Sequence, residues 1–439
     1  MSNIFRAYDV RGLYPEEINT DTAKRVGNAV VRFLEGKTFV VGEDGRTSSP
    51  ELREAVIEGI ISAGADVVCV GKCTTPLFYF GVKDSGADGG IMVTASHNPP
   101  KYNGLKITSR GGTPLGVDQG LLEIKDLAND YLESEKRGNI TDRPEMKEKY
   151  IDFLIKTSGI EPGIVKLKII VDTGNGVGSV VMKPLLERLK VSYTPLNFEI
   201  DGDFHGRFPD PATLGAMDKL KRAVVTEKAD MGIAFDGDAD RLAVLDEKGN
   251  WVPAQFILAL LWKEEPTKVV YDSRFSKSVK EFLGEDGVRS RVGHTNIADM
   301  MGYVDADLGG EASGHFFFKK MNYTESAALA ALKLIRLVQK NKISLSELVK
   351  PLDKYFYSGE VAVNIKDMKV FDSMVNHFRE KYRDGKQDEF DGLTVDYPNW
   401  WFNIRPSNTE LLMRLVVEAD TKELMEKKKK ELIQAIFSF

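Results

Sequence analysis

Three aspartates, Asp236, Asp238 and Asp240, alternate with small residues in the stretch MGIAFDGDADRLAVLD. In an extended chain, side chains at positions i, i+2 and i+4 lie on one face, so the three carboxylates would crowd together. Like charges at this distance repel one another unless a cation lies between them. Hard divalent cations such as Mg²⁺, Ca²⁺ and Mn²⁺ prefer oxygen ligands. The spacing therefore predicts a divalent metal site.

Two other interpretations of this stretch are weaker. A calcium-binding EF-hand loop that began at Asp236 would need glycine at its sixth position, where Arg241 stands. A solvated acidic loop does not explain the apolar segments MGIAF and LAVL, which flank the cluster closely and bring it near a core edge. Three carboxylates also leave Mg²⁺ room for a phosphate oxygen or water.

A second reactive stretch is IMVTASHNPPKYNGLKI, residues 91–107. A short apolar strand ends just before Ser96 and His97, and a serine beside a histidine suggests a nucleophile beside a base. Two prolines, Pro99 and Pro100, keep the following segment out of a helix. A turn is predicted at residues 103–104, an Asn-Gly pair, and it would bring Lys106 back towards the serine.

Two further loops combine polar and charged residues between strand-like runs. The first, near the C-terminus, could cradle an oxyanion, although a plain polar hairpin explains it equally well. It contains Arg405, Ser407, Asn408 and Thr409. The second is a glycine-bracketed loop whose carboxylate and hydroxyl suit sugar hydroxyl groups, and an incidental Gly-rich turn is its alternative. It contains Glu311, Ser313 and His315.

The five histidines favour the functional interpretations of these loops. Three of them, His97, His294 and His315, lie in Gly- or Ser-rich loops beside the features above, whereas His205 and His377 have the context of surface residues. His294 also follows the second strand of a repeated unit, where ligand sites of α/β sheets gather.

That repeated unit occurs three times, at residues 38–71, 168–197 and 268–293. Each copy has a β-branched run that ends at an aspartate, then a polar turn, a helical pattern and a second short strand, which is a βαβ unit. The predicted fold class is α/β, with three similar mixed-sheet α/β domains and a smaller C-terminal α+β domain. The predicted domains are residues 1–145, 146–248, 249–350 and 351–439.

The bulk composition excludes several classes of protein. The chain has 439 residues and a formal net charge of −6, without a basic arm, so nucleic acid is not an expected partner. No apolar run reaches the roughly 20 residues of a membrane span, and the N-terminus has no signal-peptide pattern. Cys69 and Cys73 are best explained as reduced thiols rather than a zinc site or a disulfide. We therefore expect a cytoplasmic protein without a membrane partner.

Taken in order, four motifs resemble those of the α-D-phosphohexomutases and span nearly the whole chain. They are TASHNP (94–99), DGDADR (236–241), GEASGH (310–315) and RPSNTE (405–410). The fold of this family, three similar α/β domains and a smaller C-terminal domain, agrees with the repeats. The opening FRAYDVRG, residues 5–12, is similar to that of the phosphomannomutase/phosphoglucomutase branch.

The resemblance implies a reaction and a role for each motif. A phosphoserine at Ser96 would exchange its phosphoryl group with a hexose monophosphate, interconverting hexose 1-phosphate and hexose 6-phosphate of mannose and/or glucose through a hexose 1,6-bisphosphate. The resemblance also implies that added hexose 1,6-bisphosphate is an activator. The implied Mg²⁺ ligands are Ser96, Asp236, Asp238 and Asp240. The implied groups for charge and proton transfer are Arg11, His97, Lys106 and His294. The implied substrate-binding residues are Arg241, Glu311, Ser313, His315, Arg405, Ser407, Asn408 and Thr409.

Alternatives to this function remain open from the sequence. They are a phosphoglucosamine mutase, a metal-dependent sugar phosphatase that uses Ser96, and a sugar-phosphate binding protein without catalysis. Hexose phosphates are the expected partners, and the chain is expected to be a monomer or a homodimer.

Overall fold

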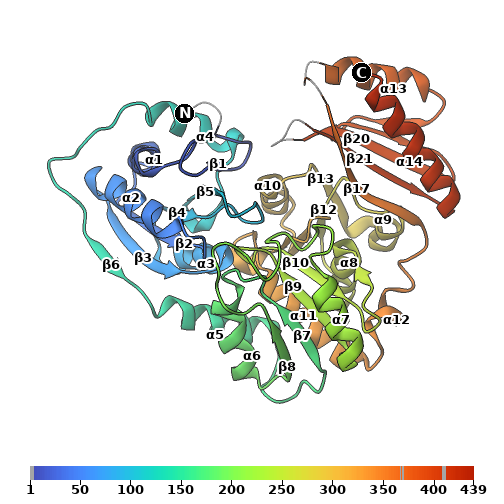
Figure 1. Ribbon diagram of the computed structural model, residues 1–439, viewed down its shortest axis with the longest axis horizontal. Helices are drawn as coiled ribbons and strands as arrows, with labels where there is room; N and C mark the ends of the chain where they lie inside the picture. Colours follow the sequence, from blue (N-terminus) through green and yellow to red (C-terminus); the bar gives the residue numbers. More distant parts are fainter. Residues whose placement is uncertain (1–3, 366, 368–369, 408–411) are drawn as a thin grey trace.

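The computed structural model describes residues 4–365, 367, 370–407 and 412–439. Four sheets follow one another along the chain, and we call the parts built on them domains I to IV. The predicted fold class is confirmed, since the first three sheets are mixed and the fourth is antiparallel throughout. The first three domains meet at the centre of the molecule, and domain IV, red in Figure 1, projects from domain III.

Domain I has a six-stranded sheet of order β1-β5-β4-β2-β3-β6. Its elements are β1 (Val10–Leu13), α1 (Thr20–Leu34), β2 (Thr38–Glu43), α2 (Ser49–Ser62), β3 (Asp66–Lys72), α3 (Thr75–Ser85), β4 (Gly89–Val93), β5 (Tyr102–Ser109), the 3₁₀ turns η1 (Arg110–Gly112) and η2 (Val117–Gln119), α4 (Leu121–Leu127) and β6 (Ile140–Asp142).

Domains II and III each have a five-stranded sheet, of order β11-β10-β9-β7-β8 and β13-β12-β14-β15-β16. The elements of domain II are α5 (Met146–Ser158), β7 (Ile169–Asp172), α6 (Gly178–Leu189), β8 (Tyr193–Leu196), α7 (Asp218–Glu227), β9 (Met231–Phe235), β10 (Leu242–Leu245) and β11 (Trp251–Val252). Those of domain III are α8 (Ala254–Glu264), β12 (Val269–Asp272), α9 (Lys277–Leu283), η3 (Gly284–Asp286), β13 (Gly287–Ser290), α10 (His294–Val304), β14 (Leu308–Gly310), β15 (Phe316–Phe318), η4 (Lys319–Met321), β16 (Thr324–Glu325), α11 (Ala327–Asn341) and α12 (Leu345–Val349).

Domain IV has a five-stranded sheet of order β17-β21-β20-β19-β18. Its elements are β17 (Phe356–Asn364), α13 (Phe371–Lys381), β18 (Lys386–Asp388), β19 (Leu393–Asp396), β20 (Trp400–Pro406), β21 (Leu412–Ala419) and α14 (Lys422–Phe437). Successive side chains of β20 point to opposite faces of the sheet, so one face packs in the domain core and the other contacts domain III. Phe402 and Ile404 pack with α13 and α14 in the domain core, whereas Trp401, on the other face, lies under the Lys280 ammonium of domain III at 4.3 Å.

The central strands of domain I pack on both faces. In β2, Phe39 and Val41 join a core with α1 and α2, while Val40, between them, joins a second core with α3. That second core continues through α5 and α6 of domain II into α8 and α11 of domain III. One continuous apolar core therefore fixes the first three domains against one another, and domain I enters it through α3 and through one face of its central strands.

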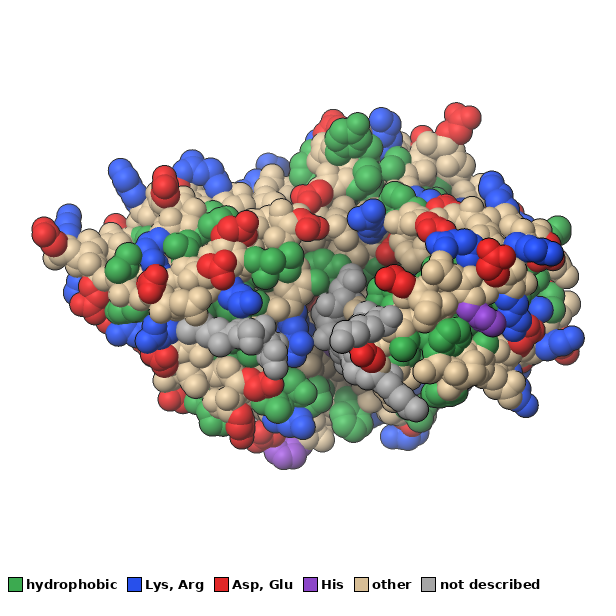
Figure 2. All heavy atoms as spheres, turned by 90° about the horizontal axis from the view of Figure 1, so that it is seen from above, with side chains coloured by type: hydrophobic (Ala, Val, Ile, Leu, Met, Phe, Trp, Pro, Cys, Tyr) green, Lys and Arg blue, Asp and Glu red, His purple; other side chains and the backbone are tan. Residues whose placement is uncertain are grey.

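The surface carries both signs of charge and several apolar residues. Figure 2 shows Lys and Arg interspersed with Asp and Glu over the face that it presents. Among the described helices, none combines the length and the apolar composition that crossing a bilayer requires. Cys69 and Cys73 carry free thiols.

Helices α1 and α2 touch backbone to backbone at Gly59. A Cβ added there would lie 2.0 Å from the carbonyl oxygen of Lys24. We expect Gly59→Ala to lower the free energy of unfolding by about 1–3 kcal/mol or more, because neither backbone can yield. The urea concentration at the midpoint of the first unfolding transition measures this loss of stability. Gly302→Ala, in α10 with no atom within 4 Å of the added Cβ, is the control and should be neutral or stabilising by about 0.5–1 kcal/mol. Equal midpoints for the two variants would contradict this packing.

Candidate active site

Three loops that occupy the same position in domains I, II and III meet at the centre of the molecule. Each joins a strand that is parallel to its neighbour to the antiparallel strand that follows, β4 to β5, β9 to β10 and β14 to β15. We call them the serine loop (residues 94–101), the aspartate loop (236–241) and the Glu311 loop (311–315). The repeated fold therefore presents one equivalent loop from each domain to a shared point.

The aspartate loop gathers the three predicted carboxylates in a buried cluster. One oxygen of each of Asp236, Asp238 and Asp240 lies within 4.8 Å of the others. The loop curls rather than running extended: Ala239 has a left-handed φ of 57°, and the N–H groups of Asp240 and Arg241 each donate to Asp236 Oδ1 at 3.1 Å. The prediction that the carboxylates converge is confirmed, but alternation along an extended chain is the wrong reason for it.

The electrostatics of this cluster call for positive charge. Burial, with Asp240 and Asp238 beside it, raises the pKa of Asp236 well above its usual range. Lys106, on β5, donates to Asp238 Oδ2 at 2.8 Å and to Asp240 Oδ2 at 2.5 Å. Burial opposes ionisation of Asp240, yet Lys106 and His315 hold its pKa well below the usual range.

A hard divalent cation fits this donor set. The donors are carboxylate oxygens, which such a cation prefers, and the Lys106 ammonium donates to two of the three carboxylates. Asp238 Oδ1 is moreover buried without a hydrogen-bond partner, which is costly unless a cation takes that place. The buried cluster is thus suited to a metal ion.

The serine loop holds Ser96 in a conformation that residues other than glycine seldom adopt. Its φ is 50°, in the left-handed region, and such strain persists only where the surroundings impose it. The Ser96 hydroxyl lies 3.0 Å from Asp236 Oδ2 and 3.1 Å from His97 Nδ1. The loop of domain I thereby places its hydroxyl against the clustered carboxylates of domain II.

A fully buried arginine, Arg46, imposes that conformation. Its guanidinium pairs with Asp44 at 3.1 Å. It also donates, at 2.7–3.0 Å, to four carbonyl oxygens of the serine loop and the strand after it. These belong to Ser96, Asn98, Pro99 and Tyr102. One side chain therefore satisfies most of the irregular backbone around Ser96.

The predicted turn at Asn103 and Gly104 is wrong, because both residues lie inside β5 and pair with β1. A Cβ on Gly104 would lie 2.5 Å from the Val10 carbonyl oxygen and 2.8 Å from that of Thr94. The glycine thus serves a close approach of three backbones. The chain reverses earlier, where Tyr102 N donates to the Pro99 carbonyl at 3.0 Å, and Lys106 still reaches the site.

Arg11 lies beside the serine loop, and His97 belongs to it. Arg11, on β1, donates to Asn98 Oδ1 at 2.5 Å and pairs with Asp9. Burial, together with Arg241 and Arg11, lowers the pKa of His97 well below its ordinary value. The imidazole beside the Ser96 hydroxyl is therefore neutral near pH 7.

The Glu311 loop of domain III contacts the aspartate loop through His315. Its ring lies between two carboxylates, with Nε2 3.2 Å from Asp240 Oδ1 and Nδ1 2.8 Å from Glu311 Oε2. Burial opposes protonation, but Asp240 and Glu311 raise the pKa of His315 to about 10. Ser313 Oγ lies 3.2 Å from the same ring, and Arg241 pairs with His315 in a backbone bridge.

His294 is the first residue of α10 and lies at the boundary of domains I and III. The ring of Tyr8, from the N-terminal stretch of domain I, lies 5.2 Å from the His294 ring, and the Tyr8 hydroxyl donates to the Val292 carbonyl at 3.0 Å. Burial, with repulsion from Lys106 and His315, lowers the pKa of His294 to about 4.

Domain IV contributes Arg405, whose side chain is buried at the end of β20. It donates to Glu360 Oε2 at 2.6 Å, and Arg274 of domain III donates to the same oxygen at 3.2 Å. Arg274 also lies 3.8 Å from Glu311 Oε1, so it links the Glu311 loop to Arg405. Ser407 follows at the half-buried end of the strand. Asn408 and Thr409 lie outside the described residues.

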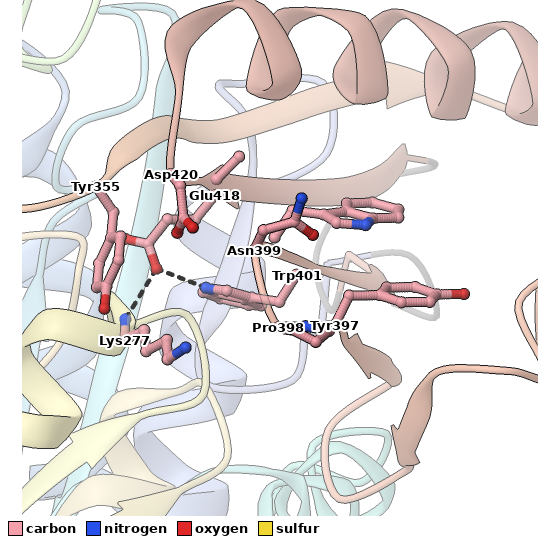
Figure 3. Close-up of a pocket in the computed structure, with 10 residues that line it drawn as sticks. Lys277, Tyr355, Tyr397, Pro398, Asn399, Trp401, Glu418 and Asp420 are labelled. Carbon is pink, nitrogen blue, oxygen red and sulfur yellow. Dashed lines mark hydrogen bonds between the residues drawn. The ribbon is translucent and has the colours of Figure 1, made fainter.

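A separate small pocket marks where domain III meets domain IV (Figure 3). Glu418 Oε2 accepts the first N–H of α9, that of Lys277, at 2.9 Å and the Trp401 indole N–H at 2.6 Å. None of the predicted site residues lines this pocket. It is an interdomain contact rather than part of the loop cluster.

The chain matches the four successive domains of one family over most of its length. Residues 2–135, 148–249 and 249–355 match phosphoglucomutase/phosphomannomutase alpha/beta/alpha domains I, II and III, and residues 362–435 match the C-terminal domain. The chain belongs to the phosphoglucomutase/phosphomannomutase family. The resemblance inferred from the four motifs is confirmed, and the protein is an enzyme of the phosphohexomutase class, an intramolecular phosphotransferase.

Full-length relatives support this assignment. A phosphomannomutase of Methanocaldococcus jannaschii is 36% identical over 441 residues, which cover 98% of this chain and 96% of the relative. A phosphomannomutase of Salmonella montevideo is 36% identical over 460 residues and all of both chains. The crystal structure of a phosphoglucomutase/phosphomannomutase family protein from Burkholderia thailandensis superposes with a TM-score of 0.87 at 29% identity, covering 100% of this chain and 98% of that one.

Sequence reasoning missed the arginines that stabilise this phosphohexomutase site. The aspartate that ends or directly follows the first strand of each repeat pairs with a buried arginine. The pairs are Asp44 with Arg46, Asp172 with Arg207, and Asp272 with Arg274. In the first and third repeats the arginine stands two residues after the aspartate, in DGR and DSR. This shared spacing is a local signal from which these two pairs could have been predicted. In the second it comes from a distant loop, and no local pattern indicates it.

The low pKa of His294 predicts acid sensitivity of the phosphohexomutase fold. In the unfolded chain this histidine takes up a proton near its ordinary pKa of 6.5, but in the folded protein only near 4. Stability is therefore lost as pH falls from about 6.5 to about 4. We expect the melting temperature of His294→Gln to fall less over this window than that of the wild type, by roughly 2–4 °C or more. His377→Gln, at an exposed position, is the control. An equal fall for wild type and His294→Gln would contradict the assignment.

Proposed function

We propose that the protein interconverts hexose 1-phosphate and hexose 6-phosphate, of mannose and/or glucose, through a phosphoserine at Ser96 and a hexose 1,6-bisphosphate intermediate. The observation that carries the proposal is the Ser96 hydroxyl, held by a strained loop 3.0 Å from Asp236 in the buried carboxylate cluster. The family membership supports the reaction class. The names of the full-length relatives and the opening FRAYDVRG support mannose or glucose over glucosamine phosphates.

Asp236, Asp238 and Asp240 would hold Mg²⁺, with an oxygen of phosphorylated Ser96 as a further ligand. A phosphoserine carries nearly two negative charges, and a bound Mg²⁺ offsets charge on the phosphoryl group during transfer. The unpartnered Asp238 Oδ1 supports this assignment. Lys106, Arg11 and Arg241 would supply the remaining positive charge around the phosphate.

The chain's own residues would move the protons. In the first half-reaction the bond between phosphorus and Ser96 Oγ breaks, and phosphorus bonds to the free hydroxyl oxygen of the hexose monophosphate. Neutral His294 would accept the proton of that sugar hydroxyl, and the departing Ser96 Oγ would take up a proton relayed from solvent by His97, whose Nδ1 lies 3.1 Å away. In the second half-reaction Ser96 Oγ bonds to the other phosphorus and gives its proton back through His97, while the sugar oxygen that leaves takes the proton held by His294. The lowered pKa of each histidine keeps its ring unprotonated near pH 7, so that a ring nitrogen is free to accept a proton.

Reorientation of the intermediate requires one site for the sugar and one for the phosphate that does not react. Glu311, Ser313 and His315 would contact the sugar hydroxyls. Arg405 and Ser407, with Asn408 and Thr409 beyond the described residues, would hold the second phosphate, and Arg405 offers a guanidinium suited to two parallel hydrogen bonds. The domain boundaries after residues 145, 248 and 350 and the oligomeric state stay predictions.

Ser96→Ala should abolish turnover, because no phosphoryl carrier remains. The assay contains Mg²⁺ and trace hexose 1,6-bisphosphate and measures isomer formation from mannose, glucose and glucosamine 1-phosphates side by side. Ser373→Ala, at an exposed position in α13, should retain wild-type activity. Turnover by Ser96→Ala would contradict the phosphoserine mechanism. Free phosphate without an isomer from the wild type would favour the phosphatase alternative.

Arg405→Ala should raise KM for the hexose phosphate by roughly 10–100-fold, the loss expected for a charge-assisted contact of about 1.5–3 kcal/mol. The Mg²⁺ requirement should not change, because no described contact of Arg405 reaches the aspartate loop. Arg383→Ala, an exposed arginine of domain IV, is the matched control. A changed Mg²⁺ requirement with an unaltered KM would contradict the placement of the second phosphate.

A further inference from the structure

The first turn of α3 brings a threonine of domain I against the aspartate loop of domain II. Thr75 is fully buried. Its N–H donates to the Asp238 carbonyl oxygen at 3.0 Å, and its hydroxyl donates to Asp238 Oδ2 at 2.6 Å. Both bonds go to the central member of the carboxylate cluster. Thr75 thus binds both the backbone carbonyl and the side-chain carboxylate of Asp238.

The capping of α3 leaves the Thr75 hydroxyl available for this contact. Thr74 precedes the helix, and its side chain accepts the Leu77 N–H at 3.2 Å. The N–H groups of a first helical turn have no partner inside the helix. Here one of them, that of Thr75, donates to a carbonyl oxygen of the neighbouring domain. The start of α3 thus gains an acceptor for its N–H group, and the aspartate loop gains a donor for its carbonyl group.

The two carboxylate oxygens of Asp238 have opposite surroundings. Oδ2 accepts from Thr75 and, at 2.8 Å, from Lys106. Oδ1 is buried and has no hydrogen-bond partner. In the other two aspartates of the cluster, hydrogen bonds reach both oxygens. Donors on one oxygen and none on the other fix the rotation of the carboxylate and leave Oδ1 for a cation.

We propose that Thr75 is a positioning residue of the metal site, which orients Asp238 so that Oδ1 faces the divalent cation. The inference rests on the proposed function for the identity of the cation and on the contacts above for the role of Thr75. A hydrogen-bonded partner behind a ligating carboxylate holds it in the geometry that the metal needs, and losing such a partner typically weakens metal affinity 10–100-fold.

A purely structural role makes a different prediction. If Thr75 only docked α3 onto domain II, its backbone N–H and its β-branched shape would suffice. Thr75→Val keeps both and removes the hydroxyl alone. Thr75→Ser keeps the hydroxyl and removes a methyl group, so the pair separates hydrogen bonding from packing.

The test measures Mn²⁺ binding to the full-length protein by electron paramagnetic resonance and the Mg²⁺ concentration for half-maximal mutase activity. We expect Thr75→Val to weaken Mn²⁺ binding and to raise the half-saturating Mg²⁺ concentration, each by roughly 10–100-fold, with activity recovering at saturating Mg²⁺. Thr75→Ser should bind Mn²⁺ nearly as the wild type does. The control is Thr22→Val, which removes a buried hydroxyl from the first turn of α1, where it contacts Asn19.

Wild-type Mn²⁺ binding by Thr75→Val would overturn the inference, as would equal weakening by Thr75→Ser or Thr22→Val. If Thr75→Val fails to fold, Thr75→Ala is the second variant without the hydroxyl group. Its Mn²⁺ affinity is then compared with that of Thr75→Ser in the same way. A wild-type protein that binds Mn²⁺ but forms no hexose phosphate isomer would overturn the proposed function instead, and the comparison of Mn²⁺ binding would still decide the role of Thr75.

Discussion

Three carboxylates buried within 4.8 Å of one another are unstable unless positive charge or hydrogen-bond donors surround them. This constraint determines how domains I to III are arranged. Lys106 and the Ser96 hydroxyl come from domain I, and His315 comes from domain III. Domain II alone cannot satisfy its own aspartate loop. The apolar core that runs through these domains keeps the donors in place.

The repeated fold explains why the donors arrive together. Each of the three mixed sheets changes from parallel to antiparallel pairing at one point, and each places a loop there. The three loops carry different side chains: a hydroxyl beside a histidine, three carboxylates, and a carboxylate beside a histidine. One architectural unit used three times therefore builds a site in which each copy contributes a different chemical group. Domain IV, with a different sheet, reaches the site from outside through Arg405, Glu360 and Arg274.

Much of this arrangement could be predicted from local patterns, because β-branched runs, glycine turns and clustered aspartates are local signals. The three repeats, the smaller C-terminal α+β domain and the clustering of the aspartates all follow from such signals, although the curled backbone that brings the aspartates together does not. The contacts that hold the site in place could not be predicted. Arg46 is a charged residue that lies fully buried because carbonyl oxygens from a distant loop surround it, and Thr75 meets Asp238 across a domain boundary. The role of Gly104 could not be predicted either, because a glycine needed for a close approach of backbones looks, in sequence, like a glycine needed for a turn.

We propose that the strained serine loop presents Ser96 as the phosphoryl carrier. Incubating the protein with Mg²⁺ and glucose 1,6-bisphosphate, followed by mass spectrometry of its peptides, tests this directly. We expect a single phosphoryl group on Ser96 that is lost when hexose monophosphate is added. Mutase activity accompanied by an unmodified Ser96, or by a phosphoryl group on another residue, would contradict it.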